Sequence, residues 1–170
     1  MALYLIPNGP MQTTASFPAV STTTSLLTLL QVKASATATF RIVEWGISFD
    51  GSSAATPGKI ELIETDVAAT VTASVAADIT KLDAAALSGG DPTTNLIPVG
   101  TTSTGYTASG EGSITSTRDL DGPQFIAPTN QYIKQFPLGR EPVVQVSKFA
   151  RIRVKFGTAV NAYCYMIIEV

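Results

Sequence analysis

The sequence contains no histidine, and this absence removes the commonest general base and the commonest metal ligand of proteins. A Ser-His-Asp triad is therefore excluded, and a zinc site would need Cys164 and carboxylates alone. Cys164 is the only cysteine, so no internal disulfide exists, which fits synthesis in a reducing compartment. The chain also lacks a GxxxxGK[ST] phosphate loop and a GxGxxG that follows a strand. We expect no enzymatic activity, no cofactor and no metal.

Charged residues are scarce, at 14% of the chain, where a typical soluble domain has about 25%. The net charge is −2 and there is no basic stripe to neutralise phosphates, so we do not expect nucleic-acid binding. No apolar run reaches the roughly 18 residues of a membrane span, and residues 1–7 lack the features of a secretory signal. The sequence indicates a soluble protein made in the cytoplasm, without a membrane partner.

Serine and threonine supply most of the polar surface, and they favour turns and strands, respectively. The 170 residues suit a single domain. Short strands separated by turns are typical of a β-sandwich or jelly roll. We therefore expect an all-β antiparallel sandwich, jelly-roll-like, with about eight strands and at most one short helix, at 76–90. The expected strand segments are 26–34, 39–51, 59–65, 69–74, 112–118, 124–128, 130–139, 142–147, 149–156 and 161–170. The spacing of the second and third predicts a hairpin.

The first 25 residues contain Pro7, Pro10 and Pro18, which argue against a helix or a central strand. This segment still carries more large apolar groups than a solvated tail would. We therefore expect an extended arm over 1–25, lying against its own domain or a neighbouring subunit, ahead of a single domain over 26–170. The apolar groups of the arm are Leu3, Tyr4, Leu5, Ile6, Met11 and Phe17.

The only tryptophan, Trp45, lies between two carboxylates, Glu44 and Asp50. In a regular strand Trp45 points to the core, among apolar neighbours that disfavour a sugar platform, and both carboxylates point the other way. Glu44 and Asp50 would then be about 20 Å apart. Catalytic carboxylate pairs are roughly 5 to 10 Å apart, so the pair is excluded unless the strand is bulged, for instance at Gly46. Hydrolysis by other carboxylates would have to use Glu44, Glu61, Glu64 or Glu111, whose spacing does not favour it.

The segment 149–156 alternates cleanly and places Arg151, Arg153 and Lys155 on its outward face. This row is compatible with a solvated surface, with cross-strand pairing to Glu61 or Glu64, or with contact to an acidic partner. Asp119 and Asp121 loosely resemble part of a calcium loop but lack its remaining ligands, so we expect a plain turn there.

The last strand, 161–170, places Cys164 inward as a small buried hydrophobe and directs Tyr163 and Tyr165 outward. Outward aromatic side chains can be covered by a loop or the arm, can anchor a subunit contact or can stack on a sugar. The sequence leaves these three roles open.

Three stretches together resemble the β-sandwich capsid decoration, or cement, proteins of tailed bacteriophages and related virion proteins. They are RIVEWGISFDGSSAATPGKIELIET, GYTASGEGSITSTRDLDGPQFIAPTNQYIKQFPLGREP and FARIRVKFGTAVNAYCYMIIE. The resemblance implies a virion protein on the exterior of an icosahedral capsid, made in the host cytoplasm. Such proteins usually act as trimers that bridge neighbouring major capsid proteins. The resemblance carries no binding motif for individual residues.

We therefore expect a structural protein whose partners are the major capsid protein and two further copies of the chain. The residues expected at interfaces are Leu3, Tyr4, Leu5, Ile6, Met11, Phe17, Arg151, Arg153, Tyr163 and Tyr165. One alternative is a tail or fibre-base virion protein on the same fold. The other is a carbohydrate-binding or receptor-binding module that uses Tyr106, Tyr132, Tyr163 or Tyr165.

Overall fold

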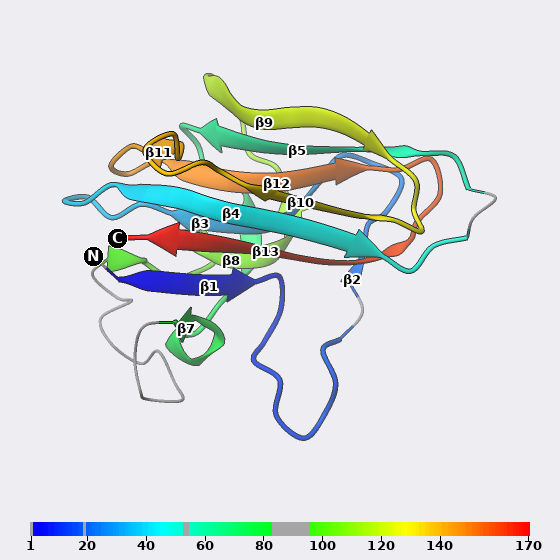
Figure 1. The fold of residues 1–170 in the computed structure, drawn as a ribbon, viewed down its shortest axis with the longest axis horizontal. Helices are drawn as coiled ribbons and strands as arrows, with labels where there is room; N and C mark the ends of the chain where they lie inside the picture. The colour runs from blue at the N-terminus through cyan, green and yellow to red at the C-terminus, as the bar shows by residue number, and fades with distance from the viewer. Residues whose placement is uncertain (1, 19, 53–54, 83–95) are drawn as a thin grey trace.

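The structure is a computed structural model that describes residues 2–18, 20–52, 55–82 and 96–170. Two antiparallel sheets pack face to face as a sandwich (Figure 1). The seven-stranded sheet has the order β10 (Gln131–Gln135), β4 (Phe40–Phe49), β13 (Asn161–Glu169), β1 (Leu3–Pro7) and β7 (Thr80–Lys81), with β11 (Val143–Val144) beside β4 and β2 (Val20–Ser21) beside β13. The six-stranded sheet has the order β6 (Thr70–Ala73), β8 (Gly105–Gly110), β3 (Leu27–Lys33), β12 (Phe149–Lys155), β5 (Gly58–Thr65) and β9 (Thr117–Ile126).

Strands from opposite ends of the sequence pair with one another in a nested order. β1 pairs with β13, β3 with β12, β4 with β10, and β5 with β9. Successive pairs alternate between the two sheets, which is the arrangement of a jelly roll. The prediction of a jelly-roll-like sandwich of about eight strands is confirmed by these eight frame strands, to which β2, β6, β7, β8 and β11 add.

The core lies between the sheets and is one continuous cluster of buried apolar side chains. Each large apolar side chain that is fully buried stabilises the fold by roughly 1.5–3 kcal/mol relative to exposure. Cys164 is buried, as expected for an inward position on β13, and burial raises the pKa of its thiol well above the usual range. The largest fully buried apolar members include Trp45, Phe40, Phe156, Ile6, Leu29, Leu30 and Ile42.

The prediction that prolines keep the first residues out of a central strand is wrong for Leu3–Pro7. This segment is β1, which pairs with β13 on one side and with β7 on the other. Pro7 is the last residue of the strand, so its missing N–H removes no hydrogen bond from the middle of the ladder. Tyr4 and Ile6 consequently belong to the core of their own domain.

The prediction of a hairpin between residues 39–51 and 59–65 is also wrong. β4 lies in the seven-stranded sheet and β5 in the six-stranded sheet, so the connecting loop crosses from one sheet to the other. The start of this crossing is held by the backbone, because the Gly51 amide donates to the Pro128 carbonyl at 2.7 Å. The hairpin prediction depends on loop length alone, and loop length does not distinguish a turn from a crossing.

A β-bulge in β4 changes which residues face the core. Glu44 is opposite Ile167 and Ile42 is opposite Ile168, so Val43 is an extra residue without a partner on β13. Before the bulge the even-numbered residues Phe40 and Ile42 are buried, and after it Trp45 is buried. The regular alternation predicted for this strand is therefore wrong over its first residues. Glu44 and Trp45 still point to opposite faces.

In the described part of the segment 76–90, where a helix is expected, the structure has a 3-10 turn, Ala76–Asp78, before β7. Residues 83–90 of that segment lie outside the described residues. β8 occupies a Gly- and Thr-rich segment for which the sequence predicts no strand, and β9 merges the separate strands predicted at 112–118 and 124–128. In the described part of the chain, no helix has the length and apolar character of a membrane span.

Candidate functional site

The outer face of the seven-stranded sheet carries a group of partly exposed apolar and aromatic side chains. We call this surface the tyrosine face, and its members are Leu3, Leu5, Ile133, Tyr163, Tyr165 and Ile167. The strand register places them side by side: Leu5 is opposite Ile167, and Gly46 lies between Ile133 and Tyr165. Ile133 is 54% exposed, although it is a large apolar residue on an edge strand. The face therefore presents apolar surface outward from three frame strands.

The loop that follows β1 folds back over this face and adds a further aromatic ring. Phe17 packs edge-on against Tyr163, with ring centroids 4.8 Å apart and an interplanar angle of 87°. Tyr163 in turn lies 6.0 Å from Tyr165. The loop is fixed by Asp78, whose Oδ1 accepts a hydrogen bond from the Met11 amide at 2.9 Å. Loop cover, one of the three roles left open for the tyrosines, thus applies to part of Tyr163.

One carboxylate lies in the middle of the tyrosine face. The Tyr165 hydroxyl donates to Glu44 Oε1 at 2.6 Å. Burial, followed by the bond to Glu44, raises the pKa of Tyr165 well above the usual range. The ring fits because Gly46 lies beneath it: a Cβ at that position would be 2.7 Å from Tyr165 Cε1. Gly46 therefore provides room for a tyrosine rather than a site for the bulge.

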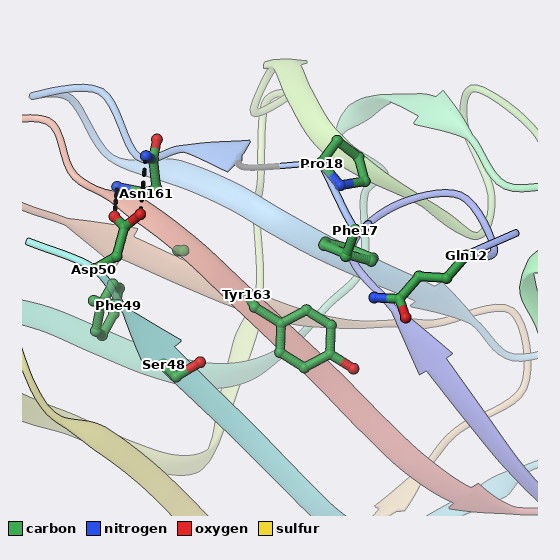
Figure 2. Close-up of a pocket in the computed structure, with 9 residues that line it drawn as sticks. Gln12, Phe17, Pro18, Ser48, Phe49, Asp50, Asn161 and Tyr163 are labelled. Atoms are coloured by element: carbon green, nitrogen blue, oxygen red, sulfur yellow. Dashed lines mark hydrogen bonds between the residues drawn. The ribbon is translucent and has the colours of Figure 1, made fainter. Parts of the chain in front are cut away.

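A hollow of about 430 Å³ lies at one end of the tyrosine face (Figure 2). Phe17 and Tyr163 line one side of it, and Asp50 and Asn161 line the other. The Asn161 side-chain amide and backbone amide each donate to the Asp50 carboxylate at 3.2 Å. We call this cavity the Tyr163 hollow.

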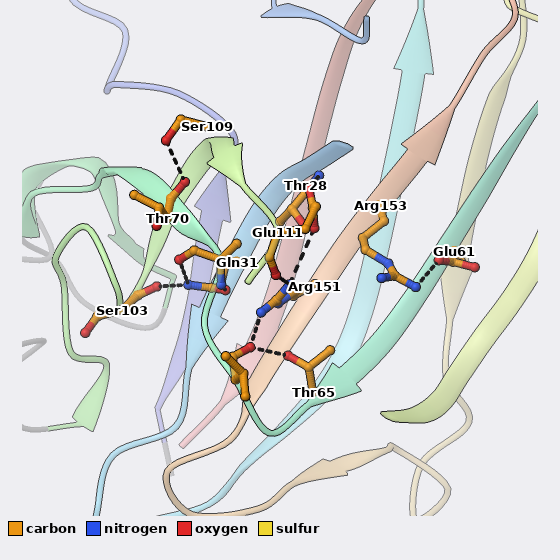
Figure 3. A network of polar contacts seen from close by, with 12 residues as sticks. Thr28, Gln31, Glu61, Thr65, Thr70, Ser103, Ser109, Glu111, Arg151 and Arg153 are labelled. Carbon is orange, nitrogen blue, oxygen red and sulfur yellow. Dashed lines mark hydrogen bonds and ion pairs between the residues drawn. The ribbon is translucent and has the colours of Figure 1, made fainter. Parts of the chain in front are cut away.

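On the outer face of the six-stranded sheet, the chain's own loops cover Arg151 and Gln31 (Figure 3). Arg151 has a fully buried side chain, and its Nη1 donates to the Glu111 carbonyl at 3.0 Å and to Glu111 Oε2 at 3.4 Å. Its Nη2 donates to the Val67 carbonyl. Glu111 also accepts hydrogen bonds from the Thr28 amide and hydroxyl, both at 2.6 Å. Burial lowers the pKa of Arg151 to about 10, so the guanidinium stays charged at neutral pH.

The prediction that Arg151 lies at an interface is therefore wrong, because its side chain is fully buried. Arg151 and Arg153 both point away from the sandwich core, but Arg151 is beneath a loop and Arg153 forms an ion pair with Glu61. The pairing with Glu61, one of the alternatives for this row, is confirmed for Arg153. Gln31 accepts a hydrogen bond from the Ala69 amide at 2.8 Å, close to Val67, and its Nε2 donates to the Ser103 carbonyl at 2.6 Å.

Trp45 joins the two sheets at their open edge. Its indole N–H donates to Asp121 Oδ2 at 2.9 Å, and the Tyr132 hydroxyl donates to the same oxygen at 2.9 Å. Burial and then the bond to Asp121 raise the pKa of Tyr132 to about 12. Asp121 is thus occupied by two side-chain donors. Across the described ranges, no three His, Cys, Asp or Glu side chains gather at one place.

The candidate carboxylates are each bound within the chain rather than gathered in one cleft. Glu44 binds Tyr165, Glu61 binds Arg153 and Lys59, and Glu111 binds Thr28 and Arg151. Glu64 accepts from Arg118 at 2.6 Å and from the Gln145 amide at 3.1 Å. Glu44 is on β4 of the seven-stranded sheet, Glu61 and Glu64 are on β5 of the six-stranded sheet, and Glu111 is in the loop after β8.

The structure gathers six of the ten expected interface residues at the tyrosine face and its loop: Leu3, Leu5, Met11, Phe17, Tyr163 and Tyr165. Tyr4 and Ile6 are in the core instead, and the two arginines are on the other sheet. Sequence reasoning missed Ile133, since β10 could not be aligned with β4 from local patterns.

Comparison of the chain with protein-family models, curated proteins and solved structures found no match.

Proposed function

We propose that this protein is a structural protein of a bacteriophage virion. It binds the outer surface of the assembled capsid as a homotrimer and stabilises the shell by bridging major capsid protein subunits. The observation that carries the proposal is the tyrosine face. Apolar surface that leaves water contributes about 25 cal/mol per Å², so a partner that covers this face gains a favourable term.

The distribution of charge supports a protein partner for the tyrosine face. Among the described residues, charged groups on it are Glu44 in the middle, Arg41 and Glu169 at one end, and Asp50 at the other. Interface centres are depleted of charge and enriched in tyrosine, with polar groups at the rim. The outer face of the six-stranded sheet instead carries charged and polar side chains that are bound mainly within the chain.

The mechanism is stabilisation by mass action. A subunit that binds the assembled shell, and not its dissociated parts, lowers the free energy of the shell. The jelly roll itself specifies no chemistry, since one fold hosts many functions, so the choice of a capsid as the partner comes from the three phage-like sequence stretches. A tail or fibre-base location on the same virion is the competing assignment.

The test uses capsids of the encoding phage that lack this chain. Purified protein is mixed with them, and electron microscopy locates any added density. Light scattering on the free protein is expected to give three times the 17.8 kDa chain mass. Capsids with bound protein are expected to resist heating better than bare capsids.

A pair of variants assigns the contact to the tyrosine face. Ile133→Glu introduces a charge on that face, and loss of one buried apolar side chain should weaken capsid binding or trimer formation by about tenfold or more. Phe125→Glu is the matched control, because Phe125 is 76% exposed on β9 of the other sheet. A monomer that adds no density to capsids would overturn the proposal, and density on the tail would support the competing location.

A further inference from the structure

We propose that the Tyr163 hollow is a binding site for a neutral saccharide. This inference goes beyond the structural role proposed above and does not depend on it. It rests on two aromatic rings that meet at a corner and on a set of polar groups that line the same cavity beside them (Figure 2).

The aromatic corner supplies the apolar part of the site. Phe17 and Tyr163 are nearly perpendicular, so a ring-shaped ligand can lie on one ring while its edge meets the other. Aromatic faces offer large, rigid apolar contact area, and the C–H faces of a sugar ring are the complementary surface. The corner is preformed. A Cβ at Gly9 would be 2.5 Å from Phe17 Cζ, so the loop backbone lies directly against the ring.

Polar groups on the other side of the hollow match hydroxyl groups. Asn161 is held against Asp50 by a side-chain and a backbone hydrogen bond, which fixes both groups before any ligand arrives. In the part of the chain that the structure describes, the side chains of Gln12 and Ser48 and the Tyr163 hydroxyl make no hydrogen bond. The hollow thus offers free donors and acceptors within one cavity.

The charge of the hollow selects among ligand classes. None of its described lining residues is a lysine or an arginine, and the Asp50 carboxylate repels phosphates and acidic sugars. A purely apolar ligand would cover Asp50 and Asn161 without satisfying their remaining hydrogen-bonding capacity, which is costly. A neutral polyhydroxylated ligand avoids both costs. The volume of about 430 Å³ falls within the roughly 300 to 1,000 Å³ of small-molecule sites.

The test is a titration of the full chain followed by amide NMR spectra. The probes are glucose, galactose, mannose, N-acetylglucosamine, maltose and lactose, with glucuronate and N-acetylneuraminate as acidic comparators. At least one neutral sugar is expected to bind with a dissociation constant on the order of 1 mM, a typical affinity for so small a ligand. Chemical-shift changes should be confined to Phe17, residues 48–50 and residues 161–163. The acidic sugars should bind more weakly.

Two variants make the assignment specific. Phe17→Ala removes one wall of the corner from a loop and should reduce affinity about tenfold while the protein stays folded. Phe125→Ala is the matched control, an exposed phenylalanine on the other sheet that should leave affinity unchanged. The proposal is overturned by absent shifts at about 50 mM of every sugar, by shifts elsewhere, or by equal effects of the two variants. Shifts produced only by a lysine-containing peptide would assign the hollow to a cationic peptide instead.

A negative sugar titration would leave the capsid assay unaffected, because that assay measures added density on capsids and not sugar binding. Likewise, a monomer that does not bind capsids can still bind a sugar in the hollow. The two proposals are therefore tested separately.

Discussion

Replacing Glu111 with alanine should destabilise the protein more than any other single change of an exposed or partly exposed carboxylate. Glu111 lies in the loop after β8 and fixes that loop to β3 and β12. Its carboxylate accepts two hydrogen bonds from Thr28, and it is the counter-charge of the fully buried Arg151. Glu111→Ala removes all of these at once and leaves the guanidinium to the Val67 and Glu111 carbonyls.

The size of the stability loss in Glu111→Ala follows from the burial of Arg151 and Glu111. Removing one partner of a buried ion pair costs about 3–5 kcal/mol, because the other charge stays buried without compensation. The Glu111 side chain is 25% exposed, so water replaces part of what is lost, and we expect the lower end, about 3 kcal/mol. For a chain of this length each kcal/mol lowers the melting temperature by roughly 2–4 °C, which gives about 6 to 12 °C.

The assay is urea unfolding together with a thermal melt. Asp119→Ala is the matched control, since Asp119 is an exposed carboxylate on β9 of the same sheet, and its removal should change the unfolding free energy by at most about 0.5 kcal/mol. The loss of stability in Glu111→Gln should lie between those of the two alanine variants, because the amide oxygen can still accept from Thr28 but carries no charge. A Glu111→Ala variant as stable as Asp119→Ala would refute the reasoning and show that the loop is held by other contacts.

Two further predictions concern ionisation. Hydrogen bonds from the Thr115 hydroxyl and the Ser116 amide lower the pKa of Asp66 from 3.8 to about 2. The stabilisation from Asp66 is therefore complete above the unfolded pKa and lost as the pH falls from about 4 to about 2, so the stability difference between wild type and Asp66→Asn should vanish over that range in urea unfolding. Asp121→Ala should cost about 2 kcal/mol, since the buried Trp45 indole loses its acceptor. It should also return the pKa of Tyr132 from about 12 toward 10, and an unchanged absorbance titration would contradict the role of Asp121.

The strands at the end of the chain could be predicted because their signal is local. In β13 the buried residues alternate with partly exposed ones from Ala162 to Ile168, as period-two reasoning requires. The same period places Tyr163 and Tyr165 outward and Cys164 inward, and the structure agrees at all three positions. Each of these outcomes depends only on which side of a strand a residue occupies.

The errors share a different origin, since each depends on contacts between distant segments. Arg151 alternates outward like a surface residue, and it is buried because the distant segments around Glu111 and Val67 bind it. The bulge at Val43 appears only when β4 is set against β13. Leu3–Pro7 is a strand because its backbone pairs with β13 on one side and with β7 on the other. No local pattern contains this information.

The two outer faces of the sandwich satisfy their side chains in different ways, and this difference gives the tyrosine face its significance. On the six-stranded sheet, Arg151, Arg153 and Gln31 point outward, and loops and strands of the same chain supply their partners. On the seven-stranded sheet, the loop that carries Phe17 reaches Tyr163 but leaves Ile133 more than half exposed. A buried polar group without a partner lowers the stability of the fold, whereas apolar surface can stay exposed at a modest cost until a partner covers it. The tyrosine face gathers apolar side chains from adjacent strands, and it is therefore the face on which we expect a partner to bind.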